Sequence, residues 1–128
     1  MRVMAIVILI LGVASLAFGV LFVTEASSAE QEIADSIQPL PIAEVDARYD
    51  AVKESQMALR MVEEPEIQAG KAAPSAMYNY LTIQRTALGL TRSQIGLISF
   101  TRTSGIINVI LGLGLILAGV GLLKKASA

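Results

Sequence analysis

Residues 105–125 read GIINVILGLGLILAGVGLLKK, an apolar run in which Asn108 is the one strongly polar side chain before Lys124 and Lys125. An α-helix rises about 1.5 Å per residue, so about 20 such residues cross the roughly 30 Å hydrocarbon core of a bilayer. The run therefore predicts a transmembrane helix over residues 104–123, followed by a short basic tail over residues 124–128.

A second apolar run opens the chain, from Val3 to Val23. Arg2 in front of it and the stretch 27–29 (SSA) behind it also fit a signal peptide with its cleavage site. The run of about 20 residues is longer than the roughly 7–15 apolar residues of a signal peptide, which favours an uncleaved span. We therefore expect an all-α membrane protein with transmembrane helices over 1–23 and 104–123, and with the lipid bilayer as its first partner.

Small residues recur every seven positions in both predicted spans. A spacing of seven keeps one face of a helix towards a neighbour, and small side chains let two backbones approach closely. The pattern predicts a helix–helix interface, within the chain or between copies, although glycine and alanine are common in membrane helices generally. The predicted interface residues are Ala5, Gly12 and Gly19 in the first span and Gly105, Gly112 and Gly119 in the second.

Asn108 lies about one helical turn inside the second predicted span. A polar side chain in the membrane indicates either a hydrogen bond across a helix–helix contact or a role in a pore or ligand site. Its place near the lipid surface favours the hydrogen bond, so we add Asn108 to the predicted interface.

Residues 24–103 are expected to form a helical region outside the lipid. Pro39 and Pro41 lack the backbone N–H that a helix uses and therefore predict a joint. Apolar residues at spacings of three, four and seven predict amphipathic helices, and the stripe that starts at Met77 continues without a break to Gly105. The predicted elements are a helix over 24–38, a proline joint over 39–41, a helix over 42–64, a loop over 65–74 and a helix over 75–103 that is continuous with the second span.

Two arrangements of these elements are consistent with their lengths. In the first, the chain forms one long helical hairpin, with the first span and the helix over 42–64 on one arm and the long helix on the other. In the second, residues 24–103 form a small three-helix bundle above the two spans.

Charge is strongly segregated along the chain. All 11 acidic residues lie between Glu25 and Glu66, and the later helix carries Arg85, Arg92 and Arg102 with no acid. Opposite charges attract at short range. Arg85 and Arg92 are therefore predicted to pair with the acidic arm of this chain or with an acidic partner.

The residue types exclude several chemistries. The chain has no cysteine and no histidine, so metal centres and catalytic mechanisms that need either residue are excluded, and no cofactor is expected. Asp46, Asp50 and Glu54 share a helix face, but without an EF-hand pattern we interpret them as a solvated face. No dense basic patch with interleaved aromatics predicts a nucleic-acid partner. We do not expect an enzyme.

These observations predict a non-catalytic structural or assembly subunit of a membrane complex, either a homo-oligomer or a partner of other membrane subunits. The alternative is a small sensor or regulator whose extramembrane helices bind a ligand or partner, and an oligomeric channel ranks last. The positive-inside rule, applied to Arg2, Lys124 and Lys125, predicts both termini in the cytoplasm and residues 24–103 outside. The expected location is the plasma membrane of a prokaryote.

Overall fold

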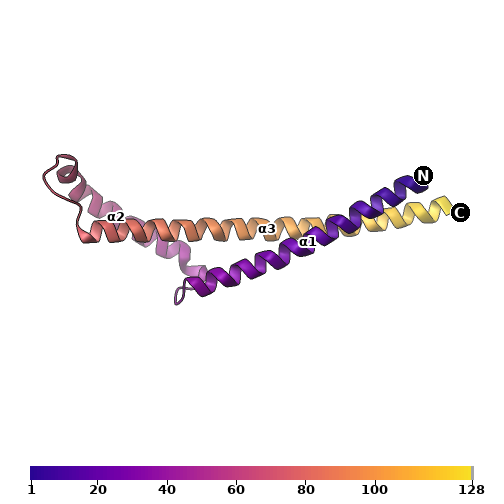
Figure 1. The fold of residues 1–128 in the computed structure, drawn as a ribbon, viewed down its shortest axis with the longest axis horizontal. Coiled ribbons are helices and arrows are strands. Elements are labelled where there is room, and N and C mark those ends of the chain that lie inside the picture. Colours follow the sequence, from indigo (N-terminus) through magenta and orange to yellow (C-terminus); the bar gives the residue numbers. More distant parts are fainter. Residues whose placement is uncertain (128) are drawn as a thin grey trace. The chain divides into compact units, whose positions relative to one another are not determined.

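The computed structural model describes residues 1–127, and this part of the chain contains helices and no strand. In chain order the elements are α1 (Arg2–Ser36), the short 3-10 helix η1 (Ile42–Glu44), α2 (Val45–Gln68) and α3 (Ala76–Ser127) (Figure 1). The predicted all-α class is therefore confirmed.

Two of these helices, α1 and α3, are long and apolar enough to cross a membrane. In each, only 11% of the most apolar 18-residue window is buried inside the protein. A helix that is apolar all round normally lies in the core of a large protein or in a membrane. The protein itself therefore leaves most of these two apolar surfaces uncovered.

The helix α1 covers the predicted span over 1–23 and nearly all of the predicted helix over 24–38. No glycine or proline lies between Gly19 and Pro39, so nothing in the sequence interrupts the helix over that length. It ends at Ser36 because Pro39 cannot donate a helical hydrogen bond and disfavours helical geometry at the residue before it.

The helix α2 differs at both ends from the predicted helix over 42–64. Its first residues form η1, and α2 then continues through Pro65 to Gln68, so the predicted loop over 65–74 is shorter than expected. Pro65 removes one N–H donor from the backbone hydrogen bonds of the helix. Near a helix end, the packing of the rest of the helix can outweigh that loss.

The stop signal for α2 is Gly70, whose φ is +68°. The Gly70 N–H bonds to the Ile67 carbonyl at 3.0 Å, and the Lys71 N–H bonds to the Glu66 carbonyl, also at 3.0 Å. These two bonds form a Schellman motif, which closes a helix by satisfying its last carbonyls and which needs a residue in the left-handed region.

The helix α3 is continuous from Ala76 to Ser127, so it contains both the predicted helix over 75–103 and the second apolar run. Ser75 caps its N-terminus, because the Ser75 hydroxyl oxygen accepts a hydrogen bond from the Tyr78 N–H at 3.1 Å. Lys124 and Lys125 belong to its last turn rather than to a separate tail, where positive charge is favourable.

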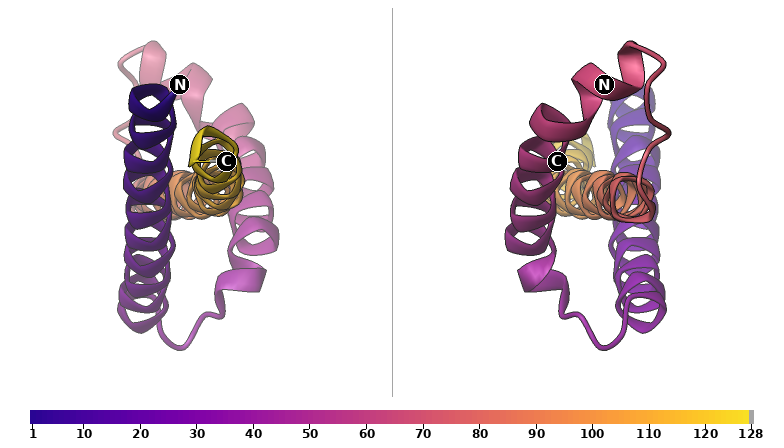
Figure 2. Two further views of the ribbon diagram at one scale, coloured as in Figure 1. Left: turned by 90° about the vertical axis from the view of Figure 1, so that its right-hand side faces the viewer. Right: turned by 90° about the vertical axis from the view of Figure 1, so that its left-hand side faces the viewer.

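The chain divides into two compact units. Unit 1 contains α1 up to Gln31 and α3 from Leu97 on, and unit 2 contains Glu32–Gly96. In unit 1 the two segments run antiparallel (Figure 1), and the N-terminal end of α1 lies near the C-terminal end of α3 (Figure 2). In unit 2, α2 runs antiparallel to the first part of α3, since Asp46 meets Arg92 while Glu63 meets Ser75.

Candidate functional site

The small residues of both apolar runs lie on one contact in unit 1. All four buried residues of α1 belong to its heptad series, and all three buried residues of α3 belong to the other. They are Ala5, Gly12, Gly19 and Ala26 on α1 and Gly105, Gly112 and Gly119 on α3. The structure therefore brings the two predicted sets of interface residues together within one chain.

The glycines of this contact allow the two backbones to touch. A Cβ added at Gly112 would lie 2.6 Å from the Leu16 nitrogen, and one added at Gly19 would lie 2.7 Å from the Gly105 carbonyl oxygen. Both distances are too short for a real side chain, so only glycine permits this separation. Because these faces are occupied inside the chain, they are not available to a second copy.

Asn108 contributes to the contact through its backbone. The Ser15 hydroxyl donates a hydrogen bond to the Asn108 main-chain carbonyl at 3.0 Å. Within residues 1–127 the Asn108 side chain itself makes no hydrogen bond. The polar link between the helices therefore comes from Ser15, not from the asparagine amide that the sequence indicated.

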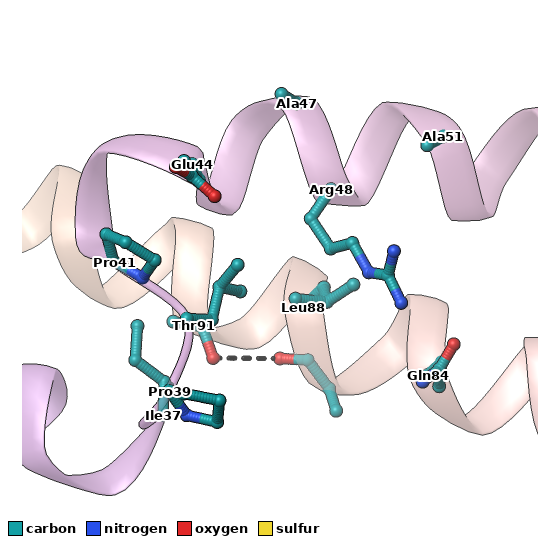
Figure 3. Close-up of a pocket in the computed structure, with 12 residues that line it drawn as sticks. Ile37, Pro39, Pro41, Glu44, Ala47, Arg48, Ala51, Gln84, Leu88 and Thr91 are labelled. Carbon is teal, nitrogen blue, oxygen red and sulfur yellow. Dashed lines mark hydrogen bonds between the residues drawn. The ribbon is translucent and has the colours of Figure 1, made fainter.

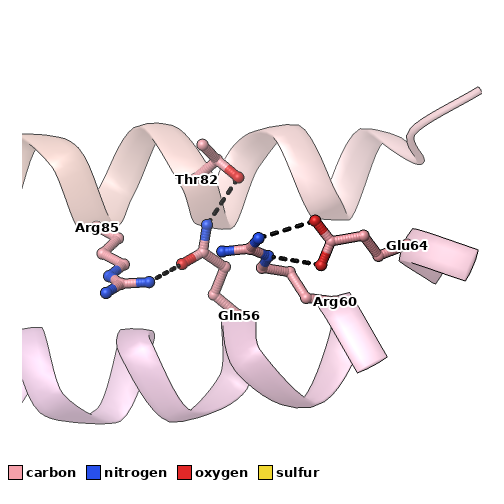
Figure 4. Close-up of polar contacts among 5 residues, drawn as sticks. All are labelled: Gln56, Arg60, Glu64, Thr82 and Arg85. Carbon is pink, nitrogen blue, oxygen red and sulfur yellow. Dashed lines mark hydrogen bonds and ion pairs between the residues drawn. The ribbon is translucent and has the colours of Figure 1, made fainter. Parts of the chain in front are cut away.

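Unit 2 is joined by a different kind of contact, centred on Gln56 of α2. Gln56 is only 5% exposed. Its amide nitrogen donates to the Thr82 hydroxyl at 2.9 Å, and its amide oxygen accepts from the Arg85 guanidinium at 2.7 Å (Figure 4). Arg85 therefore pairs with a neutral amide instead of the predicted acid.

Sequence reasoning missed Gln56 because a polar residue was not expected on the buried stripe of α2. A signal was present, since Gln56 lies four residues after the buried Val52 and therefore shares its helix face. At the end of α2 the inward-facing residue is again polar: Glu63 bonds to Ser75, whereas the neighbouring Val62 is exposed.

Arg92 makes the ion pair that the charge pattern predicted. Its Nε lies 2.8 Å from Asp46 Oδ1, and its guanidinium lies over the Tyr49 ring, 5.3 Å from the centroid. In unit 1, Arg102 pairs with Glu30. All three arginines of α3 thus point at a neighbouring helix.

Two glutamates at the end of α2 are also bonded. Glu63 accepts hydrogen bonds from the Ser75 hydroxyl at 2.6 Å and from the Ser75 N–H at 3.0 Å, and these bonds, the hydroxyl first, lower the pKa of Glu63. Glu64 accepts two hydrogen bonds from Arg60, which lower the Glu64 pKa and raise that of Arg60 (Figure 4). The side chains of Glu63 and Glu64 are therefore both held by structural contacts.

A groove of about 820 Å³ opens on unit 2 between the proline joint, the start of α2 and α3 (Figure 3). Its size falls within the range of small-molecule sites. The lining is mostly apolar and comes from Ile37, Pro39, Leu40 and Pro41 of the joint, Ala47 and Ala51 of α2, and Ala87 and Leu88 of α3. Glu44, Arg48, Gln84 and Thr91 add the polar groups.

The carboxylates of the chain do not gather into a metal centre within residues 1–127. Asp46, which the sequence placed in a row with Asp50 and Glu54, is engaged by Arg92. No protein family, curated protein or solved structure matches this chain. Its function is therefore argued from its own geometry.

Proposed function

We propose that this protein is a non-catalytic, two-span membrane protein that serves as a structural subunit of a membrane complex. The observation that carries the proposal is the contrast inside unit 1. Two apolar helices meet through backbone contact at Gly19 and Gly112, while most large apolar side chains around them face outwards.

The outward side chains explain why lipid is the proposed environment. Val3, Ile10, Phe18, Ile110 and Leu117 are each more than half exposed. Burying one large apolar side chain is worth about 1.5–3 kcal/mol, so leaving many of them in water would be very costly. A bilayer removes that cost without further protein contacts, and close packing at small residues is how helices associate in lipid.

The arrangement of unit 1 supports the proposed topology. Arg2 donates hydrogen bonds to the Ala126 carbonyl at 3.3 Å, so the two ends of the pair lie together. Two antiparallel spans leave both termini on the same side of a membrane. The basic residues at these ends favour the cytoplasmic side of a prokaryotic plasma membrane, with the remaining helices outside.

The polar side chains of unit 2 support a non-catalytic role. Gln56, Glu63, Arg85 and Arg92 are each bonded to a group on a neighbouring element. Side chains held in this way order helices against each other, which is the task of a structural subunit.

The test has two steps on the full chain. Membranes are first washed with alkaline carbonate, which releases peripheral proteins, and the retained chain is then extracted in lipid nanodiscs for native mass and identification of every chain. We expect retention and a complex of defined stoichiometry. Release by carbonate, or a lone chain in the nanodiscs, would contradict the proposal.

The groove on unit 2 favours a second candidate, a small sensor. Its apolar walls and the Arg48 guanidinium suit an apolar molecule with a carboxylate, such as a medium-chain fatty acid. A polarity-sensitive dye on Ala47→Cys should change its emission when octanoate is added, and the same dye on Asp50→Cys should not. Equal responses at both positions would count against a ligand site.

A further inference from the structure

Three basic side chains lie together at one end of unit 1. The Arg2 guanidinium donates from Nε and from Nη2 to the Ala126 carbonyl, each at 3.3 Å, so the first turn of α1 is held beside the last turn of α3. That last turn carries Lys124 and Lys125, and all three basic residues are exposed. We call Arg2, Lys124 and Lys125 the basic end of unit 1.

No acidic side chain of unit 1 lies near the basic end. The acidic residues of unit 1 are Glu25 and Glu30, both towards the other end of that part of α1. About 35 Å of helix separates Arg2 from Glu25, several times the screening length of about 8 Å in physiological salt. At the opposite end of unit 1, Arg102 is paired with Glu30. The basic end therefore carries positive charge that unit 1 does not balance.

The helix dipole accounts for only part of this arrangement. A cation is favourable in the last turn of a helix, so Lys124 and Lys125 stabilise α3 without any ligand. Arg2 lies in the first turn of α1, where the dipole disfavours a cation and where no acidic residue is present. Like charges held close together also repel each other. An anion bound from outside the chain would offset both costs.

The basic end lies at the boundary of both apolar runs. Arg2 directly precedes Val3, which opens the first run, and Lys124 directly follows Leu123, which closes the second. Under the proposed function, on which this inference rests, the basic side chains reach one membrane surface at the depth of the lipid headgroups. The anion present there at high concentration is the phosphate of a lipid.

We propose that the basic end binds the headgroup phosphate of an anionic phospholipid, such as phosphatidylglycerol. The contact with Ala126 engages Nε and Nη2 of Arg2, and the Nη1 donors remain for the phosphate. Lys124 and Lys125 add two point charges beside it. Phosphatidylcholine carries the same phosphate, but its choline cation would meet three positive charges, so the site selects the anionic lipid.

Tryptophan quenching by brominated lipid tests this site in the full chain, which has no tryptophan of its own. Val120→Trp reports the basic end, because Val120 is 40% exposed and precedes Lys124 by four residues. Leu21→Trp is the matched control, because Leu21 is 53% exposed and precedes the acidic Glu25 by four residues. Both variants are placed in vesicles of equal amounts of phosphatidylglycerol and phosphatidylcholine, with bromine on the acyl chains of one lipid at a time.

We expect phosphatidylglycerol to be enriched around the tryptophan at position 120 by at least about fivefold, the effect of one basic residue near an anionic surface. We expect no enrichment at position 21. Equal quenching by the two lipids at position 120 would overturn the site. No quenching by either lipid at either position would instead contradict the proposed membrane location, so the two failures are distinct.

Charge variants in the Val120→Trp background provide the second measurement. Arg2→Gln, and separately Lys124→Gln with Lys125→Gln, should each reduce the enrichment by at least about twofold. Lys53→Gln with Lys71→Gln removes two positive charges from unit 2 and should leave the enrichment unchanged. Full enrichment in either variant of the basic end would overturn the site.

A soluble competitor separates a lipid headgroup from a free phosphate. Glycerol phosphate carries the same phosphate chemistry without acyl chains, so it is not held at the membrane surface. We expect millimolar glycerol phosphate to leave the enrichment at position 120 unchanged. Loss of the enrichment would assign the basic end to a soluble phosphate compound and overturn its assignment to lipid.

Discussion

Unit 1 and unit 2 both pair antiparallel helices, but they are joined by opposite kinds of contact. In unit 1 the contact residues are glycines and alanines, and the backbones touch. In unit 2 the helices are linked by the side chains of Gln56, Asp46 and Glu63. Under the proposed membrane location, each pair is adapted to its solvent. Lipid would supply no hydrophobic driving force between the helices of unit 1, so close packing dominates there, whereas side chains at the water-exposed contact of unit 2 can be ordered by polar bonds.

The largest expected effect comes from filling the backbone contact of unit 1. Gly112→Leu places carbon atoms where the Leu16 backbone lies, so the helices must separate, and we expect a loss of about 3 kcal/mol or more. The free energy of unfolding in mixed micelles measures this change. Gly114→Leu is the matched control, because no atom lies within 4 Å of an added Cβ there. Equal losses for the two variants would show that unit 1 is not packed in this way.

The corresponding substitution in unit 2 removes the buried side-chain amide of Gln56. Gln56→Ala leaves the Arg85 guanidinium and the Thr82 hydroxyl without their shared partner, and we expect a loss of about 1–3 kcal/mol, measured by thermal unfolding. Ser55→Ala is the matched control, because the exposed Ser55 hydroxyl donates only to the Ala51 carbonyl of the same helix. If the two variants melt at the same temperature, the Gln56 network does not join the helices.

The pH dependence of unit 2 should be local to the start of α3. The folded-state pKa of Glu63 is lowered by its bonds from Ser75, so this contribution is present above the ordinary glutamate pKa of about 4.3 and is lost as pH falls through the lower, folded value. We expect amide hydrogen exchange at Ser75 and Tyr78 to accelerate in that acidic range. Glu63→Gln should remove the acid step, and Glu54→Gln on the exposed side of α2 should keep it. A step that survives in Glu63→Gln would assign it to another group.

The smallest expected effect is at Arg92. Its partner Asp46 and its own side chain are 69% and 50% exposed, so the coupling energy from a double-mutant cycle with Asp46→Asn should be below about 1 kcal/mol and should decrease in high salt. Arg92→Lys keeps the charge and loses the flat contact with Tyr49, so it should lose less than Arg92→Ala. A salt-independent coupling would mean that the pair is shielded from solvent.

Sequence patterns predicted most of the helices. They predicted the partners of the polar side chains only in outline. Local features of the chain can be recognised without knowing which helices pack together. They include the apolar runs, Pro39 and the heptads at Gly12 and Gly112. The predicted helix end at residue 64 was wrong, because the Schellman motif at Gly70 decides where α2 ends. Gln56 was missed because its role depends on two side chains 26 and 29 positions away.

By itself, the sequence determined that this is a helical protein with two long apolar helices, with small residues every seventh position and with all its acids between Glu25 and Glu66. Helix period, proline geometry and composition are properties of short stretches, so they can be read without a fold. Only the tertiary structure decided that the two glycine series close on each other inside one chain, which requires backbones to meet at distances that no pattern reports. It also decided that the three arginines of α3 turn inwards, because the position of a charge depends on the helix that packs against it.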